Sequence, residues 1–461
     1  MEENTKEPAK IKTLQYASLI SMSAIIGILI ALFQVAIKYL FKGINSIYDS
    51  SIETVTPLAI YTPICAVAVA LFYIFVRYFK LTLSKGTYVL SKYLSQEKVK
   101  LYEYPLLIIG FGLSLFAGLP VGAVEVCQCV GVGLASELYK RTEIKDIDSF
   151  DSISSASFGA AFMSPLAGLA YGLESRKWKV NWLYVIKLIL TIAITVGSCY
   201  LTLMLFKQQN SFMFRMGMFE KFSWKSLWTY ALMGVIIAGA AFVLNLSTLK
   251  LKTIFENKKK YKNIATILTV IVIFAALLCT FFGLKNQWYT FSLAGYDGSR
   301  IISNFDMFKR AGLLVGTVFL WAFYILLIPH SNLIGGKIVP LLTMGGLIGL
   351  CCVWNAKDNN IIQADESFMM VATGMFALFG VVYKKPATAV CLALTFSTWS
   401  LIPYQLLPLI FTIAPGYLLL ILTKLPSWNE CLGIPDSLQI IEEKKETDVV
   451  SRKNGSKNHK Y

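Results

Sequence analysis

The stretch Phe158–Gly168, FGAAFMSPLAG, decides the fold, because a second stretch, Phe379–Ala389, FGVVYKKPATA, repeats its plan. Each begins with a Phe-Gly pair, and in each a proline follows the glycine after five intervening residues and opens an apolar, small-residue segment. A glycine-rich segment precedes each copy, at Gly118–Gly133 and at Gly335–Gly349. Two halves with paired interruptions are typical of a repeat transporter or channel. The alternative is a chance similarity between apolar segments.

Three apolar stretches are interrupted by glycine and proline, namely Pro105–Gly133, Ser155–Glu174 and Ile328–Cys352. Such interruptions predict broken or half-spanning helices. Non-helical backbone at membrane depth is tolerated only where protein or a water-filled path surrounds it. The pattern therefore indicates an ion or substrate pathway.

The composition is that of an all-α, polytopic membrane protein. Of the 461 residues, 56% are hydrophobic and 15% are charged, whereas an average soluble domain has about 25% charged residues. Mean hydropathy is +0.60. This excludes a cytosolic enzyme, a secreted disulfide scaffold and a porin, whose strands alternate over about ten residues.

Full membrane spans are expected wherever an apolar run is long and uninterrupted. Tryptophans lie at several of their edges, as interfacial aromatics do. The expected spans are Leu14–Phe41, Pro57–Phe79, Trp182–Phe206, Trp228–Leu246, Ile264–Leu284, Ala311–Ile328, Phe368–Val382 and Leu406–Leu422.

The net charge of +16 gathers in short segments between apolar runs, such as Lys250–Lys262. This favours positive-inside topology and anionic lipid over a nucleic-acid partner. Cys127-Gln-Cys129 is a weak metal signal, and the two histidines, His330 and His459, give little material for imidazole chemistry. We expect no metal, no cofactor and no enzymatic activity.

At this point the chain resembles the CLC family of chloride channels and chloride/proton antiporters. Phe158–Gly168 followed by Leu173-Glu174 is similar to one family motif, and Gly335–Pro340, GGKIVP, is similar to a filter motif. The resemblance continues through Asn304–Met307 and Phe368–Leu394 and covers roughly residues 15–430. It implies about 17–18 helices in two inverted halves, and a homodimer with a separate pore in each subunit.

The resemblance also implies a pore built from broken-helix ends, since helix N-termini can hold a dehydrated anion. The ends lie near Ser84–Tyr88, Leu119–Ala123 and Gly335–Pro340, with a further residue near Trp428. The implied anion-pathway residues are Lys85, Gly86, Val121, Gly122, Gly335, Gly336, Lys337, Ile338 and Trp428.

The chain departs from the family pattern where the chemistry lies. The resemblance puts Lys85 at the usual serine, Val121 at the gating glutamate, Ser175 at the inner glutamate, Ile338 at a phenylalanine and Trp428 at a tyrosine. Because it lacks both carboxylates, the chain resembles the passive channels of the family.

The alternative to passive conduction depends on Glu125, four residues after Val121, because a displaced carboxylate there could gate the pore or carry protons. Otherwise Glu125 packs internally or at the dimer interface. Glu174 is expected to form structural hydrogen bonds. Lys85 and Lys337 either line the pore or extend to the membrane interface, and Trp428 either narrows the pore or belongs to the interfacial aromatics.

The leading hypothesis is a passive channel for chloride or a similar small anion in the plasma membrane. The alternatives are a proton-coupled antiporter with displaced carboxylates, a fluoride- or nitrate-selective relative, and a non-conducting structural or sensing relative. The expected organisation is a cytoplasmic N-terminal segment at 1–13, membrane halves at 14–206 and 223–438, an external loop at 207–222 and a disordered cytoplasmic tail at 439–461.

Overall fold

In the computed structural model, the described residues are almost entirely α-helical, and no strand occurs among them. The all-α fold predicted from the sequence is confirmed. The structure describes residues 9–54, 103–116, 121–142, 147–208, 224–256, 264–269, 271, 311–331, 334–358, 364–396 and 402–432, with scattered positions between 67 and 78.

The first half breaks where glycine and proline predicted it would. The segment Ser155–Glu174 divides into two helices, because α6 ends at Phe162 and α7 begins at Pro165 with Ser164 as its N-cap. Proline suits the first helical position, where an N–H would have no intrahelical acceptor. The described helices of this half are α1 (Ala9–Thr54), α4 (Glu103–Phe116), α5 (Val124–Thr142), α6 (Ile147–Phe162), α7 (Pro165–Ser175) and α8 (Trp182–Leu205).

The second half is interrupted in the same way. Between η3, which ends at His330, and α14, which begins at Ile338, the described chain is not helical, and Pro340 lies in the first turn of α14 as predicted. The described elements are η1 (Trp224–Ser226), α9 (Leu227–Glu256), α13 (Ala311–Leu327), η3 (Ile328–His330), α14 (Ile338–Asp358), α15 (Ala364–Val382), α16 (Pro386–Phe396), α17 (Ile402–Leu422) and α18 (Trp428–Cys431).

Helix lengths fit a membrane protein with both full and partial spans. Among the described residues, Tyr16–Leu40, Trp182–Leu205 and Trp224–Phe255 are long and apolar enough to cross a bilayer, and several shorter apolar helices accompany them. The predicted spans at Pro57–Phe79 and Ile264–Leu284 fall mostly outside the described residues. Long and short apolar helices together match the predicted broken architecture.

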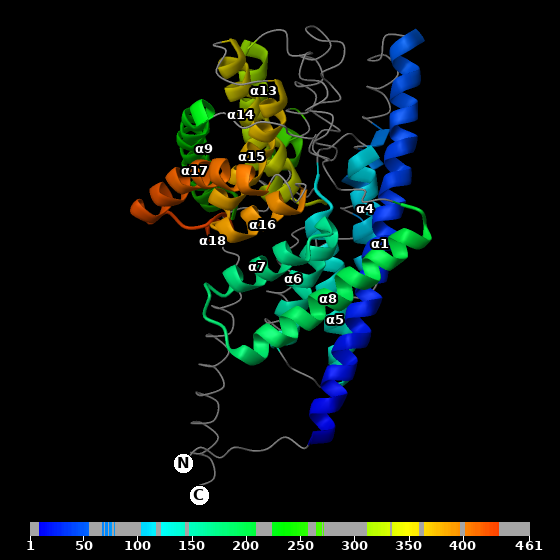
Figure 1. The fold of residues 1–461 in the computed structure, drawn as a ribbon. Helices are drawn as coiled ribbons and strands as arrows, with labels where there is room; N and C mark the ends of the chain where they lie inside the picture. The colour runs from blue at the N-terminus through cyan, green and yellow to red at the C-terminus, as the bar shows by residue number, and fades with distance from the viewer. Residues whose placement is uncertain are drawn as a thin grey trace, which may run out of the picture.

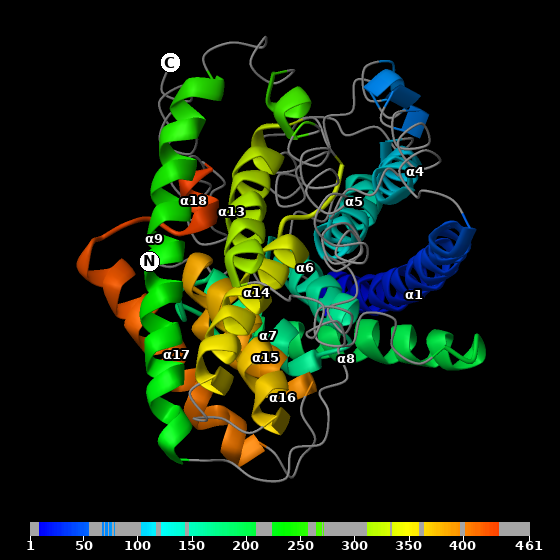
Figure 2. The same ribbon diagram turned by 90° about the horizontal axis from the view of Figure 1, so that it is seen from above.

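The two halves use equivalent helix contacts. In the first half α6 packs against α5, α7 and α8, and α1 packs against α8; in the second half α15 packs against α14, α16 and α17, and α9 packs against α17. Figures 1 and 2 show α1, α4, α5 and α8 gathered on one side of the molecule and α9, α13 and α17 on the other. α7, α15 and α16 lie between these groups in both views.

The two Phe-Gly-x5-Pro copies fold into the same turn. Met163 and Lys384 occupy corresponding positions, and both have a left-handed backbone, with φ of 52° and 54°. The next residues, Ser164 and Lys385, each donate their backbone N–H to the carbonyl of the glycine in the Phe-Gly pair, at 2.8 Å in both copies. This shared geometry confirms the predicted internal repeat.

α7 and α16 follow the two turns and lie antiparallel against each other. The start of α7 meets the end of α16, where the hydroxyls of Ser164 and Thr395 share a hydrogen bond. The end of α7 meets the start of α16, where Glu174 accepts a hydrogen bond from the Ala387 N–H at 2.7 Å. Equivalent helices that run in opposite directions are what two inverted halves require.

Candidate functional site

The two glycine-rich interruptions meet in a short antiparallel bridge between Gly122 and Gly336. The Gly122 N–H donates to the Gly336 carbonyl oxygen at 2.8 Å, and the Gly336 N–H donates to the Gly122 carbonyl oxygen at 2.7 Å. We call this pair the glycine bridge. It joins the two halves at the interruptions between their helices.

Side chains are excluded from the bridge by close contact. Gly335 has φ of 150°, and a Cβ there would lie 2.3 Å from the Cβ of Val121. A Cβ on Gly336 would lie 2.8 Å from the Gly122 carbonyl oxygen. Only glycine satisfies both the backbone conformation and the contact distance, so the backbone groups themselves line this part of the site.

Two helices start at the glycine bridge. α5 begins at Val124, two residues after Gly122, and α14 begins at Ile338, two residues after Gly336. Each helix start has N–H groups without intrahelical acceptors and carries about half a positive charge. Two such ends that converge from opposite halves favour a negative group between them.

A buried lysine and a buried glutamate accompany these helix ends. Lys337 is 7% exposed and Glu125 is 5% exposed. The backbone N–H of Lys337 donates a hydrogen bond to the Glu125 carboxylate, and the Lys337 ammonium attracts the same carboxylate. The Tyr383 hydroxyl also donates to Glu125, at 3.4 Å. The carboxylate of Glu125 is thus the negative group that lies at the start of α14 in this structure.

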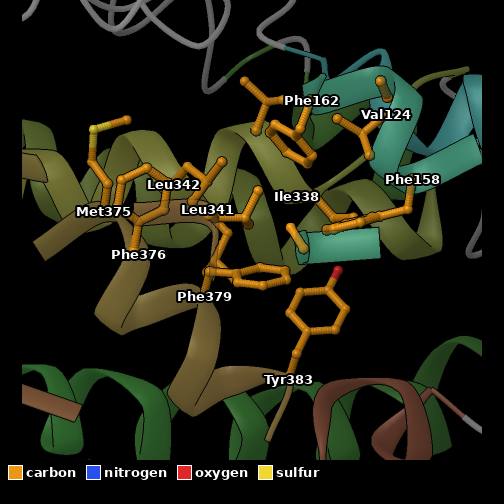
Figure 3. Packing of buried hydrophobic residues seen from close by; sticks show 14 of the residues in the cluster. Val124, Phe158, Phe162, Ile338, Leu341, Leu342, Met375, Phe376, Phe379 and Tyr383 are labelled. Carbon is orange, nitrogen blue, oxygen red and sulfur yellow. The ribbon is translucent and has the colours of Figure 1, made fainter. Parts of the chain in front are cut away.

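The walls around these polar groups are apolar. Val121 and Ile338 are 1% and 2% exposed, and Val121 packs directly against the backbone of Gly335. Figure 3 shows Ile338 near Phe158, with the ring of Tyr383 rising toward them from the end of α15. Because a low local dielectric strengthens electrostatic interactions, Lys337 and the helix ends act more strongly on an anion here than they would in water.

Trp428 lies in a second polar region, at the start of α18. It is 1% exposed, and its indole N–H has no hydrogen-bond acceptor in the described structure. The side-chain amide of Asn245, from α9, donates to the carbonyls of Val382 and Pro426 at 3.3 and 3.2 Å. Asn245 therefore ties the segment before α18 to the end of α15, next to Tyr383.

The position that the resemblance gives to the inner glutamate is occupied by a serine beside a lysine. Ser175 lies at the end of α7, and its hydroxyl accepts a hydrogen bond from the buried ammonium of Lys385. The Lys385 ammonium also lies 3.2 Å from the centroid of the Tyr171 ring. The Lys385 ammonium therefore lies at this position. The neutral Ser175 hydroxyl cannot take up and release a proton as a glutamate carboxylate would.

Glu174 has the structural role predicted for it. Its carboxylate accepts hydrogen bonds from the N–H groups of Ala387 and Thr388, at 2.7 and 2.9 Å, and from the Thr388 hydroxyl at 2.6 Å. These contacts cap the start of α16. The prediction of structural hydrogen bonding at Glu174 is confirmed.

The structure brings most of the predicted pathway residues together. The residues at the glycine bridge are Val121, Gly122, Glu125, Gly335, Gly336, Lys337 and Ile338. Trp428 lies instead on α18, and Lys85 and Gly86 fall outside the described residues.

Tyr383 is the site residue that sequence reasoning missed. A signal for it existed, because Tyr383 takes the place of Phe162 when the two turns are superposed by sequence. The second copy therefore adds a hydroxyl at a position that is apolar in the first.

No group of three or more His, Cys, Asp or Glu side chains with metal-binding geometry occurs among the described residues. Cys127 and Cys129 are both buried thiols in α5. The polar groups of the site are backbone N–H groups, one lysine, one glutamate and one tyrosine, which suit recognition of a small anion.

A family model described as Voltage gated chloride channel matches residues 87–419. No curated protein matches the chain. Among solved structures, a slow cyanobacterial Cl⁻/H⁺ antiporter aligns with TM-score 0.65 and 16% identity over 93% of this chain and 97% of the other.

Two further structures align over a similar range. A CLC-type fluoride/proton antiporter has TM-score 0.67 and 15% identity over 92% of this chain and 98% of the other. A eukaryotic CLC transporter has TM-score 0.63 and 15% identity over 92% of this chain and 74% of the other. At such low identities the likeness to these structures establishes the fold alone.

Proposed function

Because the chain belongs to the voltage-gated chloride channel (CLC) family, whose members transport anions, we propose that it conducts chloride or a similar small anion passively, past the glycine bridge. The observation that carries the proposal is the meeting of two helix N-termini from opposite halves beside the buried ammonium of Lys337. This arrangement attracts an anion mainly through partial helix charges and a single ammonium, and not through several formal cations, so the anion can also leave. No chemical step and no cofactor are part of the proposal.

Val121 and Ser175 support passive conduction. A carboxylate that swings into the anion site can bind a proton and compete with the anion, whereas the isopropyl group of Val121 does neither. Val121 is also buried against Gly335, which leaves it little freedom to move. The buried ammonium of Lys385 beside Ser175 opposes the approach of a proton from that end.

Proton-coupled anion exchange is the second candidate, and Glu125 is the observation that favours it. This carboxylate is buried at the glycine bridge, accepts a hydrogen bond from the Lys337 N–H and lies four residues beyond Val121, in the first turn of α5. An anion that replaces Glu125 at the helix ends would leave a carboxylate ready to take up a proton. Two of the similar structures are of proton-coupled antiporters.

Reconstitution into liposomes separates the two candidates. We expect anion efflux with no proton movement in the opposite direction, and a reversal potential that follows the anion gradient and is unaffected by a pH gradient. Fluoride and nitrate replace chloride in parallel runs to rank the anions. Stoichiometric proton movement against the anion would establish coupled exchange, and silence in both records would favour a non-conducting relative.

The variant Glu125→Gln refines this experiment, because glutamine keeps the shape of glutamate and cannot be ionised. Under passive conduction it leaves anion flux independent of the pH gradient, as in the parent. Under coupled exchange it abolishes proton movement while anion flux continues. Glu103→Gln, on the neighbouring helix α4, is the control that changes a carboxylate away from the glycine bridge.

Lys337→Met tests the anion site itself. Even at an effective dielectric near 20, two opposite charges about 4 Å apart interact by roughly 4 kcal/mol before desolvation costs. We expect Lys337→Met to weaken anion binding, measured by calorimetry in detergent. Unchanged binding and flux would place Lys337 outside the anion pathway.

We further propose that the protein is a homodimer in the plasma membrane with both termini in the cytoplasm. The topology rests on lysine distribution, since Lys250–Lys262 collects positive charge. Cysteines introduced at Ser211 and Asn257 test it: a membrane-impermeant reagent added outside is expected to label the first and not the second. Cross-linking in native membranes tests the dimer.

A further inference from the structure

Asn245 is a buried amide side chain of α9 that contacts two other segments at once. It is 0% exposed. Its amide nitrogen donates to the Val382 carbonyl at 3.3 Å and to the Pro426 carbonyl at 3.2 Å, and it has two protons, one for each. Its side-chain oxygen has no hydrogen-bond partner among the described residues. The amide therefore acts as a donor that holds two distant segments together.

The first of these segments is the end of α15. Val382 is the last residue of α15, and in a continuing helix its carbonyl would accept from the residue four positions later. That residue is Pro386, which has no N–H. The Asn245 amide supplies the missing donor. The next residue along the chain is Tyr383, whose hydroxyl donates to Glu125, so the amide fixes the helix end from which Tyr383 reaches the glycine bridge.

The second segment is the start of α18, where Pro426 lies two residues before Trp428. Ser427, between them, is fixed by a capping box: its N–H donates to the Glu430 carboxylate at 2.8 Å, and its hydroxyl accepts from the Glu430 N–H. The Cys431 thiol donates to the same Pro426 carbonyl at 3.6 Å. These local bonds leave the chain little freedom between that carbonyl and the indole, so a hydrogen bond that fixes the carbonyl also fixes the indole.

The helices around Asn245 make it a fixed point for both segments. α9 packs against both α15 and α18, and Figure 2 shows α18 beside α9. Trp428 is 1% exposed, so its ring lies inside the protein, and its indole N–H has no acceptor among the described residues. A buried donor without a partner costs free energy, and a small shift of the ring changes which group it can reach. The place of the indole therefore depends on the Asn245 amide.

We propose that Asn245 is a positioning residue of the anion pathway: its amide fixes Trp428 relative to the end of α15 and thereby sets the discrimination between anions. The inference rests on the proposed anion conduction. Asn245 itself does not contact the anion and acts through the indole. A site discriminates well only if its groups are held within about 0.5 Å of their proper places, and two hydrogen bonds from one buried amide provide such a hold.

Asn245→Leu tests the proposal, because leucine has the branched shape of asparagine and no N–H group. Efflux of fluoride, chloride and nitrate is measured separately from liposomes, and the preference is the ratio of the best to the worst conducted anion. We expect this preference to fall by up to roughly fivefold, as the loss of one hydrogen bond of ordinary strength would give. An unchanged preference, or a parent with no preference among the three anions, would refute the positioning role.

Two further variants separate positioning from general loosening. Thr248→Val is the matched control, because Thr248 lies three residues after Asn245 in α9, is 0% exposed and has no hydrogen-bond partner for its hydroxyl among the described residues. It should keep the preference of the parent, and an equal fall there would refute the proposal. In a Trp428→Phe background, Asn245→Leu should change the preference by less than about twofold, because the two residues act as a unit. A full effect in that background would show that Asn245 does not act through the indole.

The remaining outcomes are also decisive. Asn245→Ala replaces Asn245→Leu if the leucine variant does not fold, as judged by size-exclusion chromatography in detergent. If neither folds while Thr248→Val does, Asn245 is a structural residue and the positioning role is refuted. If the parent itself conducts no anion, the proposed function fails and the inference fails with it. If the parent conducts and Asn245→Leu keeps its preference, only the inference fails.

Discussion

The turn at Phe158–Pro165 and the turn at Phe379–Pro386 have the same backbone and different chemistry. Each is closed by a hydrogen bond of 2.8 Å to the carbonyl of the glycine in its Phe-Gly pair. In the first turn Ser164 caps its own helix, because its hydroxyl accepts from the Ala167 N–H at 3.1 Å. In the second turn Lys385 stands in the place of Ser164 and provides no such cap.

The second turn obtains its helix cap from the other half of the molecule. Glu174 caps α16, while Lys385 reaches in the opposite direction and contacts the end of α7. A carboxylate at a helix start and an ammonium at a helix end both match the helix dipole. The repeat thus supplies two identical turns, and the substitutions in the second one connect the halves and place polar groups near the pathway.

Glu174→Ala should cause the largest loss. It leaves the N–H groups of Ala387 and Thr388 without their acceptor and removes a charge-assisted contact between the halves, so we expect a destabilisation of about 3 kcal/mol. The midpoint of thermal aggregation in detergent measures it. Glu174→Gln, which keeps one acceptor oxygen, should lose less. A loss no larger than that of Ser164→Ala would mean that the cap between halves adds nothing.

Lys385→Ser makes the second turn resemble the first, and we expect it to cost about 2 kcal/mol because the ammonium contacts with Ser175 and Tyr171 are lost. A serine at 385 cannot recover this by capping α16, since Glu174 already accepts from its N–H groups. Lys385→Met keeps the volume and removes the charge. A Met variant as stable as the parent would show that packing, and not the ammonium, matters here.

The turns and helix breaks were predictable because they depend on local chemistry. Proline at the first helical position and glycine at a broken segment act on the backbone within a few residues, so the start of α7 and the break before α14 followed from the sequence. The resemblance implied that the segments Leu119–Ala123 and Gly335–Pro340 belong to one pore, but the pairing of Gly122 with Gly336 was not predicted, since no local rule joins two segments so far apart.

Contacts between the halves were not predictable in the same way. Glu174 and Ala387 are 213 residues apart in sequence, and Tyr383 and Glu125 are 258 apart. Their meeting depends on how two packed halves orient their side chains, which hydrophobic pattern does not specify. Lys384-Lys385 illustrates the difficulty: two adjacent lysines suggest a solvated pair, yet Lys385 is only 6% exposed.

Ser164→Ala tests the first turn alone. Loss of the N-cap acceptor and of the hydrogen bond with Thr395 should destabilise the protein by about 1 kcal/mol, since a serine N-cap is typically worth that much. Thermal aggregation again provides the measurement, and anion flux should not change because the glycine bridge is untouched. Thr395→Ala is the control that keeps the cap of α7 and removes the contact between halves, together with the hydrogen bond from Thr395 to the Cys391 carbonyl within α16. A loss in Ser164→Ala equal to that in Glu174→Ala would erase the difference between the two turns.

Tyr383→Phe gives the second turn the apolar residue that the first turn has at Phe162, and it should have the smallest effect on stability. The hydroxyl makes one hydrogen bond, at 3.4 Å, so its removal should cost less than about 1 kcal/mol.

The effect of Tyr383→Phe on transport should be easier to detect. The Tyr383 hydroxyl helps to hold the Glu125 carboxylate at the helix ends, and an incoming anion competes for the same donors. Weaker retention of Glu125 by about 1 kcal/mol should raise anion flux at subsaturating concentration by up to about fivefold. The gain should vanish in Glu125→Gln/Tyr383→Phe relative to Glu125→Gln, because the competing charge is then absent. A gain that persists in the double variant would show that the hydroxyl acts on the pathway directly, and that the two turns differ at the pore for a reason unrelated to Glu125.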